Sequence, residues 1–175
     1  MKKPVIIALV GPSGSGKTAL GTYLENNCGI PQIASCTTRP MRPGEVQGRE
    51  HTFVDVEDMP PRDEMLAYGE FGGHHYWVRL KDVDRLERCT YTIDDGPLAE
   101  MKRKYGDRYD ILSVRIRRKS ESGVDPERLR RDEGKFTLPD SFYDVVINND
   151  GTLDEFLRVG SAIVTSLLKS KSPIA

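Results

Sequence analysis

The stretch VIIALVGPSGSGKT, residues 5–18, decides the fold of this chain. Its last eight residues fit the pattern G-x-x-x-x-G-K-[ST] at every fixed position, and they directly follow a continuous apolar run. From Thr18, the last residue of the motif, to Leu24 the chain has helical spacing. A buried strand, a glycine-rich turn and a helix are the parts that a phosphate-binding loop requires. The stretch therefore predicts a site for the phosphates of a nucleoside triphosphate.

Each residue type in this loop has a physical reason to be there. Glycines let the backbone curl until successive N–H groups point at phosphate oxygens, and the N-terminus of the following helix adds partial positive charge. Lys17 is expected to reach the β- and γ-phosphates, and the Thr18 hydroxyl is expected to bind Mg²⁺. The predicted ATP-binding residues are Gly11, Pro12, Ser13, Gly14, Ser15, Gly16, Lys17 and Thr18.

Length and composition narrow the class of protein. A chain of 175 residues, with 37% hydrophobic and 30% charged residues, is sufficient for one compact domain. A net charge of −1 argues against a general nucleic-acid binder. The three cysteines lack metal-ligand spacing and are expected to be reduced thiols. No apolar run is long enough to span a membrane, so we expect a soluble, cytoplasmic protein with no membrane partner.

Apolar patterns alternate between strand and helix along most of the chain. Strands are predicted at 4–10, 31–36, 89–94, 109–117 and 143–148, and helices at 16–27, 81–88, 97–105, 125–136 and 152–169. Thr152 and Glu155 form a capping box at the start of the last helix. Such alternation predicts an α/β fold of three layers, in which helices cover both faces of a parallel sheet.

Two segments interrupt this alternation. Prolines and glycines separate short extended pieces in residues 38–80, which predicts a small mixed insertion. Residues 118–127 are polar and contain glycine, and they predict a flexible lid. We expect a single domain over 1–175, with its core at 1–37, 81–117 and 137–175, the insertion at 38–80 and a short lid at 118–136.

A second candidate phosphate site lies at the start of the insertion. Arg39 and Arg42 are three residues apart, and each is followed by a proline that stiffens the backbone. Paired guanidinium groups suit a phosphate because bidentate contacts both bind it and fix its orientation. A solvated basic loop is the alternative that the local sequence leaves open.

These residues resemble guanylate kinase in order over nearly the whole chain. The resemblance is carried by the phosphate loop at 11–18, by TTRP at 37–40 with RPGE at 42–45, by the hairpin motif at 70–76 and by YDVVINN at 143–149. It implies a core, a monophosphate-binding insertion and a closing lid. The implied reaction transfers a phosphoryl group from ATP to GMP or dGMP and uses Mg²⁺ as the cofactor.

The resemblance also assigns roles to individual residues. The catalytic residues that it implies are Lys17, Arg39, Arg42, Arg128 and Arg131. The acceptor-binding residues that it implies are Ser35, Arg39, Arg42, His51, Glu70, Tyr76 and Asp94. Thr18 and Asp94 are the implied metal residues. Asp94 matches the family's acid at the end of the central strand, and the adjacent Asp95 is an alternative candidate for the same role.

Several positions depart from the family pattern. His51 replaces a tyrosine that contacts the acceptor phosphate, and Ala67 replaces a glutamate that reads guanine. Trp77 and Val78 replace a glycine and a serine. The lid is short, so the first lid arginine has no clean counterpart; Arg117 and Arg118 are the candidates to replace it, while Arg128 matches the second. The phosphate-binding positions are thus better kept than the base-reading ones, and the class of nucleoside monophosphate kinase is better supported than the base.

Three other functions stay open from the sequence. A kinase of related fold that acts on a different or modified nucleotide, or on a phosphorylated small molecule, would explain the altered base-reading positions. A non-catalytic module that binds a protein partner would not need a complete triphosphate loop. A regulatory ATPase or GTPase switch would not need the paired arginines.

Overall fold

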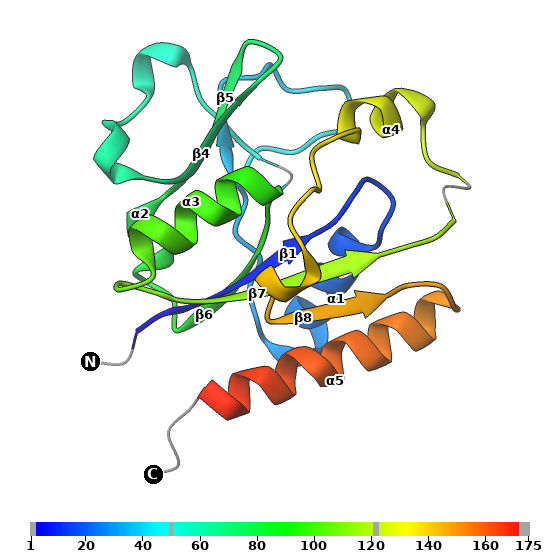
Figure 1. Ribbon diagram of the computed structural model, residues 1–175. Coiled ribbons are helices and arrows are strands. Elements are labelled where there is room, and N and C mark those ends of the chain that lie inside the picture. The colour runs from blue at the N-terminus through cyan, green and yellow to red at the C-terminus, as the bar shows by residue number, and fades with distance from the viewer. Residues whose placement is uncertain (1–2, 50, 121–122, 172–175) are drawn as a thin grey trace.

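A four-stranded parallel sheet forms the centre of the molecule, as seen in the computed structural model, which describes residues 3–49, 51–120 and 123–171 (Figure 1). The strand order is β6-β1-β7-β8. These strands are β1 (Val5–Val10), β6 (Arg88–Thr92), β7 (Asp110–Arg117) and β8 (Val145–Asn148). All six residues of β1 are buried, as expected for a central strand with helices on both faces.

Alternate residues of β1 enter two separate hydrophobic cores. Ile7 and Leu9 pack with side chains of α1 (Lys17–Cys28) and α5 (Leu153–Lys171), whereas Ile6, Ala8 and Val10 pack with side chains of α3 (Asp95–Tyr105). Figure 1 shows α5 running along one face of the sheet. This arrangement confirms the predicted three-layer α/β fold with a parallel sheet.

A second, mixed sheet forms most of the insertion. Its order is β3-β2-β5-β4, with β2 parallel to β3 and antiparallel to β5. The strands are β2 (Cys36–Thr37), β3 (Thr52–Phe53), β4 (Met65–Phe71) and β5 (His74–Arg79). Two short 3-10 turns, η1 (Val56–Asp58) and η2 (Arg62–Glu64), connect β3 to β4. The single tryptophan, Trp77, is 1% exposed and packs with Cys36 and Met65 on one face of this sheet.

The pairing of β4 with β5 decides which side chains share a face. Gly69 lies opposite Tyr76, Glu70 opposite His75, and Phe71 opposite His74. Paired residues of antiparallel strands lie on one face, and successive residues alternate. Glu70 therefore lies on the face opposite to Tyr76. An irregularity between Leu66 and Gly69 contains Ala67 in the left-handed conformation, with φ 52°.

The lid segment, defined here as residues 123–136, crosses above the loop that follows β1 (Figure 1). Its helix α4 (Pro126–Asp132) begins at Asp125, whose Oδ1 accepts a hydrogen bond from Glu127 N–H at 2.8 Å. Pro126 at the first helical position needs no N–H partner. The helix ends before Gly134, which has φ 73°. The predicted lid range 118–136 also includes residues 121 and 122, which lie outside the described residues.

Three predicted elements were wrong in extent. The strand predicted at 31–36 is reduced to an isolated bridge between Gln32 and Thr90, because the chain leaves β6 to join the second sheet as β2. The helix predicted at 81–88 is only α2 (Leu80–Val83), because residue 88 already pairs with Val5 in the central sheet. The helix predicted at 125–136 ends at Asp132, before the left-handed Gly134.

A buried polar cluster fixes the chain where it returns from the lid to the core. Arg115 on β7 donates to the carbonyl oxygen of Leu138 at 2.9 Å and to the Tyr143 hydroxyl at 3.1 Å. Tyr143 donates in turn to Asp95, which is 2% exposed and also accepts from Leu138 N–H at 3.0 Å. A short turn, η3 (Asp140–Phe142), precedes Tyr143. The cluster joins α3, β7 and the segment that precedes β8.

Within the described part of the chain, no helix combines the length and apolar character needed to cross a lipid bilayer.

Candidate active site

The loop at residues 11–18 joins β1 to α1 and lies at the carboxyl end of the central sheet. Glycine is required at Gly11, where a Cβ atom would lie 2.3 Å from the carbonyl oxygen of Ile116. It is also required at Gly16, which precedes α1 with φ 107°. The loop is therefore held tightly against β7, and its backbone conformation is the one that glycine permits.

Contacts from three other segments hold the loop in place. Asn149, after β8, donates from Nδ2 to the carbonyl oxygen of Ser15 at 2.9 Å. Arg118, after β7, donates from Nη1 to the carbonyl oxygen of Gly14 at 3.1 Å. Arg117 instead pairs with Asp140. Of the two arginines that the sequence offered as a replacement lid arginine, Arg118 is the one that contacts the loop.

Lys17 folds back over the loop that contains it. Its Nζ donates to the carbonyl oxygen of Gly11 and, at 2.9 Å, to that of Pro12. Burial lowers the pKa of Lys17 to about 8, while the carboxylates of Asp94 and Asp132 oppose this shift. The charges of Arg128 and Arg131 lower this pKa further, so the two predicted lid arginines lie within electrostatic range of Lys17.

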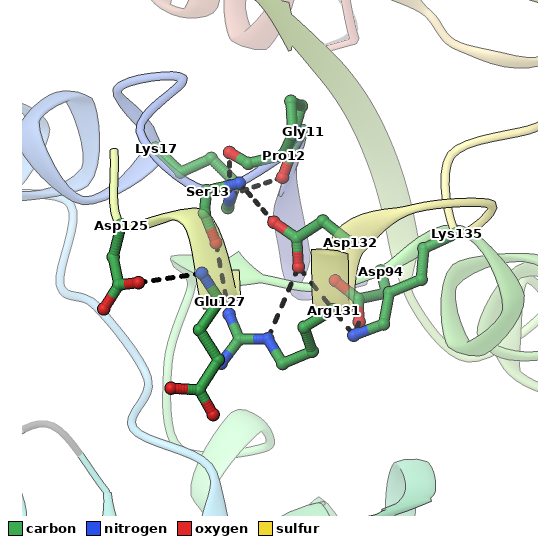
Figure 2. Close-up of polar contacts among 10 residues, drawn as sticks. All are labelled: Gly11, Pro12, Ser13, Lys17, Asp94, Asp125, Glu127, Arg131, Asp132 and Lys135. Atoms are coloured by element: carbon green, nitrogen blue, oxygen red, sulfur yellow. Dashed lines mark hydrogen bonds and ion pairs between the residues drawn. The ribbon is translucent and has the colours of Figure 1, made fainter. Parts of the chain in front are cut away.

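Residues of the lid segment meet the loop directly, as Figure 2 shows. Ser13 N–H donates to Asp132 Oδ2 at 2.6 Å, and Arg131 Nη2 donates to Ser13 Oγ at 3.1 Å. Lys135 Nζ lies 3.5 Å from Asp94 Oδ2 and 4.0 Å from Asp132 Oδ1. The lid segment thus brings two cations and one carboxylate to the end of the central sheet.

Asp94 and Asp95 have different environments, although they are adjacent in the chain. Asp94 is about half exposed and faces Lys135, whereas Asp95 is buried and accepts hydrogen bonds from Tyr143 and Leu138. The hydrogen bonds of Asp95 are internal to the fold. Of the two acids, Asp94 is the one that can meet a ligand.

A second cluster gathers predicted acceptor residues on the insertion. Arg39 forms a bidentate ion pair with Glu45, at 2.8 and 3.0 Å, and its guanidinium carbon lies 5.4 Å from the centre of the Phe53 ring. The hydrogen bonds that Arg39 donates to Glu45 raise the pKa of Arg39, and Tyr76 contributes to the same shift. The ion pair lowers the pKa of Glu45 to about 2. Arg39 is thus a fixed, permanently charged group.

The imidazole of His51 lies beside this cluster. Its Nδ1 is 2.8 Å from Ser35 Oγ, and its ring centre is 5.9 Å from that of Tyr76. Glu45 also accepts the backbone N–H of Arg42 at 2.7 Å, which fixes the backbone at Arg42 while its side chain remains exposed. The structure therefore brings together Ser35, Arg39, His51 and Tyr76, with Arg42 at their edge.

Glu70 does not join the acceptor cluster. Its carboxylate accepts from the Tyr68 hydroxyl and lies 3.7 Å from His75 Nδ1, on the face of the second sheet opposite to Tyr76. Glu70 was grouped with the acceptor residues as a neighbour that could substitute for the guanine-reading glutamate replaced by Ala67. The alternation of side chains along β4 separates Glu70 from the acceptor residues.

Three residues at this site were not predicted from the sequence. Phe71, at the end of β4, lies 4.5 Å from Lys135 Nζ and 5.9 Å from the guanidinium carbon of Arg131, measured to the ring centre. Asp132 and Lys135 contact the loop and Asp94, as described above. Their sequence context, a run of charged residues at 127–135, is typical of a solvated helix face, so no local signal marked them.

A glycine-rich loop with its lysine, an arginine of the lid segment that contacts this loop and a second cluster around Arg39 define a P-loop kinase of the α/β class. Comparisons with known proteins identify the family. The family model described as guanylate kinase matches residues 1–165.

Named relatives agree with this match. A guanylate kinase of Nitrobacter winogradskyi is 30% identical over 96% of this chain and 85% of its own length. That of Bradyrhizobium diazoefficiens is 27% identical over 99% and 88%. The crystal structure of guanylate kinase from Anaplasma phagocytophilum superposes with a TM-score of 0.66, at 26% identity, over 99% of this chain and 98% of that one. The chain belongs to the guanylate kinase family.

Proposed function

We propose that this protein transfers the terminal phosphoryl group of ATP to GMP or dGMP, yielding ADP and the nucleoside diphosphate. The observation that carries the proposal is the presence of two cationic sites on one side of the molecule. Lys17 and the loop form one site, and Arg39 with Tyr76 forms the other. The face of the second sheet that presents Tyr76 also presents Phe71, which contacts the lid cations bound at the loop.

The proposed mechanism uses alignment and charge neutralisation. The loop N–H groups and Lys17 hold the donor phosphates, and Arg39, Arg42, His51 and Tyr76 hold the acceptor phosphate. Arg128 and Arg131 approach from the lid and neutralise charge on the phosphoryl group as it moves. Closure of the lid excludes water, which suppresses hydrolysis of ATP. The acceptor oxygen is already anionic, so the mechanism assigns no residue as a strong general base.

The oxygen donors at this site suit Mg²⁺. Thr18 is an exposed residue in the first turn of α1, and the Asp94 carboxylate lies within electrostatic range of Lys17. Mg²⁺ is usually held by one or two protein oxygens together with substrate phosphates. We propose that Thr18 and Asp94 hold it, Asp94 directly or through water. The ion supplies neutralisation of the phosphate charge when it is bound.

Base recognition is the part of this function that the residues support least. Ala67 and Val78, at positions that the resemblance assigns to base reading, are 7% and 1% exposed and pack into the core beside α3. A site without a polar partner for a substrate group loses discrimination. A kinase that acts on a different or modified nucleotide, or on a phosphorylated small molecule, is therefore the second candidate function.

We also propose the domain boundaries and the compartment. The insertion at 38–80 and the lid at 118–136 are proposed as the parts that move against the core at 1–37, 81–117 and 137–175. A cytoplasmic location is proposed because Cys28, Cys36 and Cys89 are all free thiols.

The test is an ADP-release assay with Mg·ATP against GMP, dGMP, AMP, CMP, UMP and dTMP. We expect turnover with GMP or dGMP, and we expect Lys17→Ala to abolish it. The variant Arg42→Ala should mainly raise the KM for the acceptor. If only another acceptor supports turnover, the second candidate function is the correct one, and the proposed mechanism applies to that acceptor. If all acceptors fail while ATP still binds, the proposed function is wrong.

A further inference from the structure

The carboxylate of Asp132 contacts the phosphate loop in a way that its neighbours on the lid do not. Asp132 Oδ2 accepts the backbone N–H of Ser13 at 2.6 Å, and its side chain is only 9% exposed (Figure 2). Asp125 caps α4 instead, and Glu133 is exposed. One acid of this charged segment has therefore been withdrawn from solvent and directed at the loop.

The partner that Asp132 takes is of the kind that a phosphate oxygen requires. Backbone N–H groups of such loops donate hydrogen bonds to anions, and a carboxylate presents a charged oxygen acceptor as a phosphate does. Burial alone would raise the pKa of Asp132, but hydrogen bonds from Ser13 and the charges of Arg131 and Lys135 reverse the shift. The side chain is therefore an anion at neutral pH.

The cations around this carboxylate belong to the same contact. Arg131 Nε lies 3.5 Å from Asp132 Oδ1, and Arg131 also donates to Ser13 Oγ. Lys135 Nζ lies 4.0 Å from the same carboxylate oxygen. An anion that replaced the carboxylate at the Ser13 N–H would meet these two cations without a large movement of the lid.

We propose that Asp132 is an internal competitor for the donor phosphates: its carboxylate holds the lid on the loop of the free enzyme, and ATP binds by displacing it. This inference rests on the proposed function, because it requires ATP to bind at residues 11–18. It makes the affinity for ATP weaker than the loop alone would give, and it keeps Arg131 and Lys135 at the loop before ATP arrives.

The first test measures binding of ATP by calorimetry, once with a chelator and once with Mg²⁺. Asp132→Ala should bind chelated ATP about tenfold more tightly than the wild type, because a charge-assisted hydrogen bond no longer has to be broken. Glu133→Ala is the matched control, since it removes the same charge from the next residue. It should change the affinity by less than about twofold. If Asp132→Ala leaves binding unchanged, or weakens only Mg·ATP as expected of a metal ligand, the inference is wrong.

The second test reads the contact itself in the absence of nucleotide. The Ser13 amide should exchange with solvent about tenfold faster in Asp132→Ala than in the wild type or in Glu133→Ala. In Asp132→Asn, which keeps the side-chain shape, the exchange rate should lie between that of the wild type and that of Asp132→Ala. An unchanged exchange rate in Asp132→Ala would show that any gain in affinity came from the loss of a negative charge near the loop and not from the loss of this hydrogen bond. That result would overturn the inference.

Lys17→Ala separates this inference from the function on which it rests. If Lys17→Ala binds ATP like the wild type, ATP does not bind at the loop, and the proposed function fails together with the inference. If Lys17→Ala loses ATP while Asp132→Ala behaves like the wild type, only the inference fails.

Discussion

The ammonium group of Lys17 is buried beneath the carbonyl oxygens of its own loop, and its pKa is about 8 for that reason. A lowered lysine pKa means that the folded state disfavours the charged form. The buried charge therefore lowers the free energy of unfolding below about pH 8. This loss is recovered as the pH rises from about 8 toward the unfolded pKa near 10.5. Binding of ATP needs the charged form of Lys17. As the pH rises through this range, the free energy of unfolding therefore increases while the affinity for ATP decreases.

We therefore predict that the affinity for ATP falls as the pH rises through about 8. Titration of ATP into the wild type between about pH 7.5 and 9.5 measures this fall. The groups whose charges shift this pKa are Asp94, Asp132, Arg128 and Arg131. Lys17→Arg keeps its charge throughout this range and should give a flat profile. A wild-type profile as flat as that of Lys17→Arg would contradict the prediction.

Glu45 has no predicted contact with substrate, yet it holds two parts of the acceptor cluster. It pairs with the guanidinium of Arg39 and accepts the backbone N–H of Arg42. We predict that Glu45→Gln raises the KM for the acceptor about tenfold and changes kcat by less than about twofold, because charged bidentate contacts are lost while the donor site is untouched. Steady-state kinetics with GMP at saturating ATP would measure this, with Glu57→Gln on η1 as the control. An unchanged KM would show that binding of the acceptor does not depend on the ion pair between Glu45 and Arg39.

At the scale of the elements, the buried cluster around Asp95 holds α3, β7 and the segment before β8 together. Removal of one partner leaves the others buried without their hydrogen bonds. We predict that Asp95→Ala lowers the free energy of unfolding by about 3 kcal/mol and that Tyr143→Phe lowers it by about 1 kcal/mol. Urea unfolding followed by circular dichroism measures both. Equal losses for the two variants would mean that the carboxylate carries no more than the hydroxyl.

Individual elements also show how far the sequence could be followed. The apolar run before the loop specified β1, and the capping pair specified the start of α5, where Glu155 N–H donates to Thr152 Oγ1 at 3.3 Å. The prediction of a strand at 31–36 was wrong because apolar residues indicate that a segment is buried but do not specify which sheet it joins. Its last residue belongs to β2 of the second sheet.

The candidate site divides in the same way. Lys17 and Arg39 could be predicted from short motifs, because their expected chemistry depends on residues a few positions away in the chain. Asp132 contacts Ser13 across 119 positions, and no local pattern encodes such a contact. Glu70 was misplaced for a related reason, since its face depends on the register of β4 against β5.

At the scale of the whole molecule, Phe71 joins the insertion to the lid. It is 46% exposed, and its ring faces Lys135 and Arg131. We predict that Phe71→Ala increases hydrolysis of ATP relative to transfer by about threefold to tenfold, because loss of the cation–π contacts loosens the closure that excludes water. Phe71→Tyr keeps the ring and should behave like the wild type.

Val56→Ala is the matched control for this prediction. Val56 is 58% exposed and lies on η1 of the insertion. ADP release measured with and without acceptor gives the ratio of hydrolysis to transfer for each variant. A ratio for Phe71→Ala that matches that of Val56→Ala would mean that the contact does not couple the two parts.

The burial of Trp77 makes the molecule its own optical reporter. The chain has one tryptophan, and that side chain is 1% exposed within the second sheet, whereas α1 and α5 pack on the central sheet. Indole emission therefore monitors the insertion alone, and far-ultraviolet ellipticity is dominated by the helices. Coincident denaturation curves from the two signals would mean that the insertion and the core melt as one cooperative unit. An earlier emission change would give the insertion a separate and lower stability, and its opening could then be timed in a stopped-flow instrument without any attached dye.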